Sequence, residues 1–225
     1  MYEEFKRIGW LLFAERLVDS HGGNMSVLRG DKILITRRGS MLGDLKPEDI
    51  IEVGLEPGEN DKLASMELPT HRELYKQKKG EAIIHAHPAN AIAISITDNK
   101  IVPQDAEGLY LYKAAPIVRV RDGVGSEETV RLLPSFLGGD NVVAVVKGHG
   151  SFAVGKNLED AYKYTSSLEN SCRILVAVRS AGPRPQPPAI ASNNREPRRD
   201  NKSGLRSAIP PGIGVMGRSD RYRKR

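Results

Sequence analysis

Residues 1–180 alternate short strand-like segments with helix-like segments, and this alternation limits the possible folds more than any other property of the chain. Apolar or alternating segments predict strands at residues 24–28, 32–36, 50–53, 81–85, 115–120 and 142–147, with 152–154 as a hairpin partner of the last. Apolar positions at helical spacing predict helices at residues 2–20, 66–79, 88–96, 126–133 and 157–179. Such an alternation indicates an α/β fold in which helices cover a mixed sheet.

The composition changes at Ala181, which predicts a globular domain at residues 1–180 and a tail at residues 181–225. The tail holds 7 of the 14 prolines, and 11 Lys or Arg against 3 acidic residues. Residues 1–180 hold 23 basic and 25 acidic residues, so the net charge of +6 belongs to the tail. We therefore expect no nucleic-acid binding by the domain, whereas the basic, Pro/Arg-rich tail leaves that partner open.

The chain also lacks the usual signals for export or membrane insertion. Glu3 and Glu4 stand where a secretory signal carries basic residues, and no apolar run reaches the roughly 18 residues of a membrane-spanning helix. Cys172 is the single cysteine, which excludes an intramolecular disulfide, and its apolar helical neighbours predict a buried core residue. Together these features predict a soluble, cytoplasmic protein with no membrane partner.

Two histidines end the strand-like run that begins at Glu81 and is closed by Pro88. Side chains two residues apart in a strand project from the same face, so His85 and His87 point the same way. Two imidazoles at a strand end can begin a Zn²⁺ or Mn²⁺ site, although they can also be polar residues at the rim of a sheet.

His149 and Glu67 extend this constellation. His149 follows the apolar segment 142–147 in a Gly-His-Gly turn, and is either a loop residue or the third imidazole of an open catalytic metal site. Glu67 lies at the start of the predicted helix 66–79. An acid there can simply be stabilised by the helix dipole, or it can face a metal and move a proton. His71, one turn later, is expected to be a helix-face residue rather than a ligand.

Small and hydroxyl-bearing residues predict an anion pocket. They occur in the runs 22–26 and 36–40, and at Ser65 just before the acid at position 67. Backbone amides exposed in glycine-rich turns can bind a phosphate. Arg37 or Arg38 can add two parallel hydrogen bonds from one guanidinium.

Taken in order, these motifs resemble the class II aldolase/adducin family, including its fuculose-phosphate aldolases. Over residues 1–178 they are Gly-Asn-x-Ser, Thr-x-x-Gly, Ser-x-Glu before a helix, His-x-His-Pro, and Gly-His-Gly after an apolar strand. Five motifs in this order are far more specific than any one of them. The resemblance implies a three-layer α/β/α fold with a mixed, mostly antiparallel central sheet. It also implies a homotetramer with active sites between subunits.

The same resemblance assigns roles to individual residues. It implies Zn²⁺ or another divalent cation such as Mn²⁺ at His85, His87 and His149, with Glu67 as both metal ligand and acid/base. It also implies that Asn24, Gly39 and Ser65 surround a substrate phosphate. Adducin heads share the fold but typically lack the metal histidines, so the histidines of this chain favour an enzyme.

Three positions depart from the family pattern. Met66 stands where fuculose-phosphate aldolases carry a second phosphate-contacting serine, and Arg38 replaces a small hydroxyl residue in the phosphate loop. Where those aldolases supply a tyrosine acid from the neighbouring subunit, Glu107 aligns best. The candidates for the second acid or base are therefore Glu107 and Tyr222, the latter from a neighbour's tail docked near the cleft. The alternative for Glu107 is a structural ion pair. We expect the substrate to be a sugar phosphate of open identity.

The predicted reaction is a reversible retro-aldol cleavage of a phosphorylated ketose through a metal-stabilised enediolate, with Glu67 transferring the proton at the enediolate carbon. One alternative is a sugar-phosphate epimerase, decarboxylase or dehydratase of the same fold, because each starts from the same enediolate. The other is a non-catalytic, adducin-like interaction module.

Overall fold

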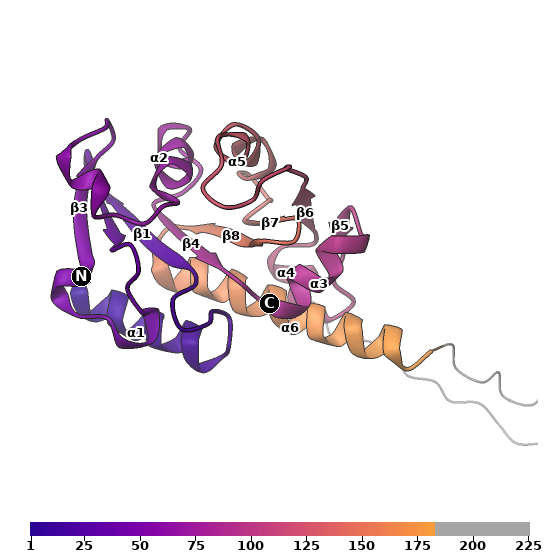
Figure 1. Ribbon diagram of the computed structural model, residues 1–225. Coiled ribbons are helices and arrows are strands. Elements are labelled where there is room, and N and C mark those ends of the chain that lie inside the picture. Colours follow the sequence, from indigo (N-terminus) through magenta and orange to yellow (C-terminus); the bar gives the residue numbers. More distant parts are fainter. Residues whose placement is uncertain (183–225) are drawn as a thin grey trace, which may run out of the picture. The chain divides into compact units, whose positions relative to one another are not determined.

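The computed structural model describes residues 1–182, and within them eight strands form one sheet in the order β3-β2-β1-β4-β8-β7-β6-β5 (Figure 1). The strands are β1 (Asn24–Arg29), β2 (Lys32–Thr36), β3 (Ile50–Gly54), β4 (Ala82–Ala86), β5 (Lys100–Ile101), β6 (Ala115–Val118), β7 (Val143–Val146) and β8 (Gly150–Gly155). Neighbours in this sheet are antiparallel, except for the parallel pair β6 and β7. The sheet is therefore mixed and mostly antiparallel, as predicted.

Helices cover both faces of the sheet. They are α1 (Tyr2–Ala14), α2 (Leu68–Lys76), α3 (Ala89–Thr97), α4 (Ala106–Leu111), α5 (Glu127–Leu132) and α6 (Leu158–Ser180), with short 3₁₀ turns η1 (Leu42–Asp44), η2 (Pro47–Asp49), η3 (Glu59–Lys62) and η4 (Leu133–Phe136). Figure 1 shows α2 and α5 above the sheet, and α1, α3, α4 and α6 below it. This arrangement is the predicted three-layer α/β/α fold.

Strand β4 lies between the two hydrophobic cores, and all five of its residues are buried. Ile83 packs into the core under α2, whereas Ile84 packs into the core over α1 and α6. Because strand side chains alternate between faces, His85 points to the same side as Ile83, toward the layer that contains α2.

Two helices begin at side-chain caps. The side chain of Asn157 accepts a hydrogen bond from the Asp160 amide at 2.8 Å and starts α6. Ser126 Oγ likewise accepts from the Thr129 amide at 3.1 Å and starts α5. Both caps satisfy amides that have no partner inside the helix. Cys172 on α6 is buried, as predicted.

The first helix is shorter than predicted, because it ends at Ala14 and not at residue 20. Arg16 adopts a left-handed backbone with φ of 59°, which turns the chain. Leu17 is then buried, and its carbonyl accepts a hydrogen bond from the His87 amide at 2.8 Å. The apolar side chain of Leu17 continues the helical spacing and so predicted a longer helix. In the structure, the turn at Arg16 buries this side chain instead.

Two elements lie between residues 97 and 114, a stretch to which no helix or strand was assigned from sequence. Strand β5 has two residues and α4 has six, so neither is long enough to produce a periodic pattern. Helix α4 starts where the Asp105 carboxylate accepts a hydrogen bond from the Gly108 amide at 2.8 Å.

None of the helices in residues 1–182 combines the length and apolar character that crossing a membrane requires. The predicted tail, with Tyr222, lies outside the described residues.

Candidate metal and substrate site

Three histidines meet at one end of the central strands. His85 lies on β4, His87 follows that strand, and His149 lies in the turn between β7 and β8. Strand β8 pairs with β4, with Phe152 opposite His85, which brings the turn beside the two histidines. One ligand atom from each imidazole lies within 4.8 Å of the others, so the three residues can hold a metal ion together.

The close packing of the three histidines requires a glycine at position 150. A Cβ atom added to it would lie 3.0 Å from His85 Cε1 and 2.8 Å from His87 Cδ2. Gly148, on the other side of His149, has a φ of +69°, a conformation that L side chains rarely adopt. The two glycines therefore explain why the third histidine lies in a Gly-His-Gly turn.

The His85 ring is held in place from two sides. It is 2% exposed, and it stacks on Phe152 with 4.2 Å between the ring centroids. Its Nδ1 lies 3.0 Å from the Ser151 carbonyl oxygen, which accepts the ring N–H. The lone pair is then on Nε2, which lies 3.0 Å from His87 Nε2. A backbone carbonyl that accepts from the far nitrogen in this way commonly fixes the tautomer of a metal-binding histidine.

The three imidazoles also have the protonation state that a metal needs. Burial lowers the pKa of His85 well below its usual value, and burial likewise lowers the pKa of His87 and of His149. The rings are thus neutral near pH 7, the form in which imidazole binds metal. In addition, His149 Nδ1 is buried and has no hydrogen-bond partner among the described residues. This donor set fits Zn²⁺ and similar cations.

Glu67 lies next to the histidines but is held by other groups. It is 3% exposed and occupies the N-cap position of α2. Its Oε1 accepts a hydrogen bond from the Gly125 amide at 2.8 Å, and its Oε2 accepts from Thr70 Oγ1 at 3.0 Å. Glu67 is not part of the group of candidate ligand atoms that the three histidines form. Its carboxylate therefore has a fixed position, which suits a group that moves a proton.

A cavity of about 240 Å³ contains these residues and the predicted anion pocket. The predicted site residues that line it are Asn24, Arg38, Gly39, Ser65, Glu67, His85, His87 and His149. Asn24 is 6% exposed, and its Oδ1 has no partner among the described residues. The Arg37 guanidinium donates to the Glu48 carbonyl at 2.9 and 3.1 Å, whereas Arg38 makes no side-chain hydrogen bond or ion pair within residues 1–182. Arg38 is thus the arginine that remains available to an anion.

One predicted residue, Glu107, is not brought to this cavity. Glu107 is exposed in the first turn of α4 and does not line the cavity of its own subunit. Tyr222 lies outside the described residues. His71 is a buried residue of α2 and is not among the candidate ligands, as predicted.

The loop between β6 and α5 was not predicted to contribute to the site. Val124 from this loop lines the cavity, and the Gly125 amide contacts Glu67. The only signal was the Gly-x-Gly spacing at 123–125, which is common in ordinary turns.

Residues 3–176 match the family model described as the Class II Aldolase and Adducin N-terminal domain. The chain belongs to the class II aldolase and adducin family. An L-fuculose phosphate aldolase of Methanocaldococcus jannaschii is 30% identical over 178 residues, which cover 77% of this chain and 94% of that protein. Another, from Methanococcus maripaludis, is 32% identical over 171 residues, which cover 76% of this chain and 93% of that protein.

A solved structure supports the same conclusion for this member of the class II aldolase and adducin family. The l-fuculose-1-phosphate aldolase of Thermus thermophilus has a TM-score of 0.74 and 34% sequence identity, and the match covers 81% of this chain and 97% of that one. The family resemblance that five motifs indicated is therefore confirmed.

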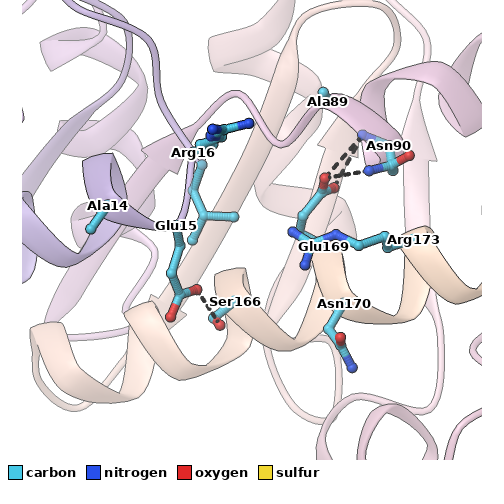
Figure 2. Close-up of a pocket in the computed structure, with 10 residues that line it drawn as sticks. Ala14, Glu15, Arg16, Ala89, Asn90, Ser166, Glu169, Asn170 and Arg173 are labelled. Carbon is cyan, nitrogen blue, oxygen red and sulfur yellow. Dashed lines mark hydrogen bonds between the residues drawn. The ribbon is translucent and has the colours of Figure 1, made fainter.

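Glu169 supports the start of helix α3, which follows the candidate ligand His87. It lies on α6 and reaches the first residues of α3, at the wall of a cavity of about 680 Å³ (Figure 2). Its carboxylate accepts hydrogen bonds from Asn90 Nδ2 at 2.7 Å and from the Asn90 and Ala91 amides at 3.2 Å. Because α3 begins two residues after His87, this buried cap fixes the turn that carries the histidine.

Replacing Glu169 with leucine is expected to lower the free energy of unfolding by about 2 kcal/mol, because α3 loses a charged cap. Urea unfolding followed by circular dichroism measures this change. Glu169→Gln keeps one acceptor and should lose less. The neighbouring, exposed Asn170→Leu is the control, and an equal loss there would show that the cap contributes nothing specific.

Proposed function

We propose that this chain is a metal-dependent carbon–carbon lyase that reversibly cleaves a phosphorylated ketose into a triose phosphate and an aldehyde. The observation that carries the proposal is a single cavity lined both by three neutral imidazoles and by groups that can bind an anion, Arg38 among them. A phosphorylated ketose needs both, since its carbonyl end and its phosphate end have different chemistry.

His85, His87 and His149 would hold a divalent cation, with Zn²⁺ preferred for nitrogen donors and Mn²⁺ as the alternative. When bound, the cation supplies Lewis acidity toward the ketone oxygen of the substrate. Three protein ligands are the number that catalytic zinc sites use, and such a set would leave room for the substrate to bind the cation. To ligate the cation as well, the Glu67 carboxylate would have to give up its hydrogen bond with the Gly125 amide or the one with the Thr70 hydroxyl.

Glu67 would act as the acid and base at carbon. A base removes the proton from the hydroxyl group on the carbon that becomes the aldehyde. The carbon–carbon bond then breaks, and the aldehyde leaves. Glu67 then delivers a proton to the ketose carbon from which the aldehyde has departed. The two hydrogen bonds to its carboxylate hold both oxygens in place for this transfer.

The second acid or base would come from another subunit. Glu107 is exposed and does not line the cavity of its own subunit, so it can act only if a neighbouring copy presents it. We therefore include a homotetramer with sites between subunits in the proposal. Tyr222 of a neighbour's tail is the other candidate for this role.

Asn24, Arg38, Gly39 and Ser65 would bind the phosphate. Arg38→Ala is expected to raise KM for a phosphorylated ketose about 10-fold or more while changing kcat little, because the guanidinium binds substrate and transition state alike. Steady-state kinetics of the metal-loaded enzyme measure both constants. Lys100→Ala, which removes one charge from the edge strand β5, is the control. An unchanged KM in Arg38→Ala would mean that this arginine does not contact the phosphate.

The relatives support an aldolase-type activity, because proteins named as fuculose phosphate aldolases match this chain along nearly their whole length. Met66, which is 49% exposed at the cavity, and Glu107 depart from their pattern and favour a different sugar phosphate. An epimerase, decarboxylase or dehydratase would use the same groups at the carbonyl end. The three histidines argue against a non-catalytic, adducin-like module.

Product analysis tests the proposal. Metal-loaded protein would be incubated with a panel of phosphorylated ketoses, and the products separated by chromatography. Cleavage predicts equal amounts of a triose phosphate and an aldehyde. An isomer, a dehydrated sugar phosphate or released carbon dioxide would instead identify the epimerase, dehydratase or decarboxylase reaction.

A further inference from the structure

His71 is a buried histidine that the proposed reaction does not use. It lies on α2, one turn after Glu67, and its side chain is fully buried. Its Nδ1 lies 2.6 Å from Ser26 Oγ, which in turn lies 2.6 Å from the Tyr75 hydroxyl. Burial lowers the pKa of His71 to about 3, so the ring is neutral. These contacts tie helix α2 to strand β1.

Packing alone does not explain an imidazole here. His71 Nε2 is buried and has no hydrogen-bond partner among the described residues. A buried polar atom without a partner typically costs about 1–3 kcal/mol. A leucine at position 71 would bury no unpaired ring nitrogen, but it would also remove Nδ1, the hydrogen-bond partner of the Ser26 hydroxyl. A buried polar atom without a partner therefore calls for an explanation other than packing.

The contacts of His71 lead to both halves of the site. Its backbone amide donates to the Glu67 carbonyl at 3.0 Å, at the start of α2. Its ring meets Phe152 edge-on, with 6.2 Å between centroids and 68° between planes. Phe152 in turn stacks on His85, at 4.2 Å and 21°. The backbone bond is the ordinary i→i−4 bond of a helix, so the contact specific to the His71 side chain is the one with Phe152. This side chain thus lies on the helix that begins after Glu67 and meets the ring that stacks on His85.

We infer that His71 is a positioning residue: anchored by Ser26, it sets the distance between the Glu67 carboxylate and the His85 imidazole through α2 and Phe152. This inference rests on the proposed function. If the Ser26 bond is lost, the ring can turn, Phe152 can follow it, and His85 loses the surface on which it stacks. The carboxylate and the metal-binding ring would then both shift, although neither is altered chemically.

Three variants separate positioning from packing. Asparagine places its amide near the position of Nδ1 and can keep the Ser26 bond, whereas glutamine places its amide near Nε2 and cannot. Ser26→Ala removes the partner and leaves the imidazole. His71→Gln and Ser26→Ala are therefore expected to weaken Co²⁺ binding and lower kcat by about 10- to 100-fold, as loss of groups behind metal ligands typically does. His71→Asn should retain most of both.

The readouts are the visible absorption spectrum and affinity of bound Co²⁺, together with kcat and KM for a phosphorylated ketose that the wild-type enzyme cleaves. Cys172→Ala is the control, because Cys172 is buried in the core on the other side of the sheet. The inference predicts that this variant loses thermal stability but keeps the wild-type spectrum and kcat.

Two results would overturn the inference while leaving the proposed function intact. One is a wild-type Co²⁺ spectrum, affinity and kcat in His71→Gln and Ser26→Ala. The other is an equal loss in Cys172→Ala, which would mean that any loss of stability has the same effect. If the wild-type protein binds no Co²⁺, the proposed function itself fails and the inference falls with it.

Discussion

Replacing His85 with alanine is expected to remove the bound metal and the lyase activity together. His85 is the most deeply buried of the three imidazoles, and its orientation is fixed by the Ser151 carbonyl and by Phe152. Its loss leaves two imidazoles, fewer than the three protein ligands of a catalytic zinc site. Metal affinity should fall by more than about 100-fold, beyond the roughly 10- to 100-fold effect of groups behind the ligands.

Elemental analysis of dialysed protein measures this loss, with about one ion per chain expected in the wild type. His21→Ala is the matched control, because His21 also lines the cavity but lies outside the candidate ligand group. It should keep both metal and activity. Unchanged metal content in His85→Ala, with the fold intact by circular dichroism, would eliminate the proposed metal site.

Replacing Glu67 with glutamine is expected to lower kcat by roughly 10²- to 10⁴-fold, the usual contribution of acid–base catalysis. Glutamine has nearly the same shape, and its carbonyl can still accept the hydrogen bond from Gly125. The Thr70 hydroxyl can rotate to accept from the new amide. The side chain should therefore stay in place while the ability to carry a proton is lost.

Metal content separates the two roles of Glu67. A pure acid/base predicts unchanged metal affinity with low kcat, whereas a ligand predicts that both fall in step. Glu73→Gln is the control for the loss of a charge on α2. Glu73 is partly exposed, and its carboxylate accepts a hydrogen bond from the Gln77 side chain. Wild-type turnover in Glu67→Gln would reduce Glu67 to a helix-start residue.

The grouping of the three histidines could be predicted from sequence because its signal is local. The two-residue repeat of a strand places His85 and His87 on one face, and the glycines beside His149 mark a tight turn. The register of the sheet then brings the three histidines together. The order of the motifs was sufficient to predict that they lie close to one another.

Other parts of the site could not be predicted because their contacts are long-range. The amide of Gly125 contacts a carboxylate 58 positions earlier in the chain, and no local pattern marks such a pair. Leu17 was assigned to the first helix because an apolar residue at that position continues the helical spacing, although the structure buries it through the turn at Arg16. The catalytic roles of Glu107 and Tyr222 stay predictions, since each depends on a neighbouring subunit.

The central claim is that the three histidines hold a cation required for cleavage of a phosphorylated ketose. The most direct test is triose phosphate release by the wild-type chain after chelator treatment, measured before and after Zn²⁺ or Mn²⁺ is added back. The account predicts no release from the chelated protein and full recovery on reconstitution, with no recovery in His85→Ala. Equal release with and without the metal would contradict it.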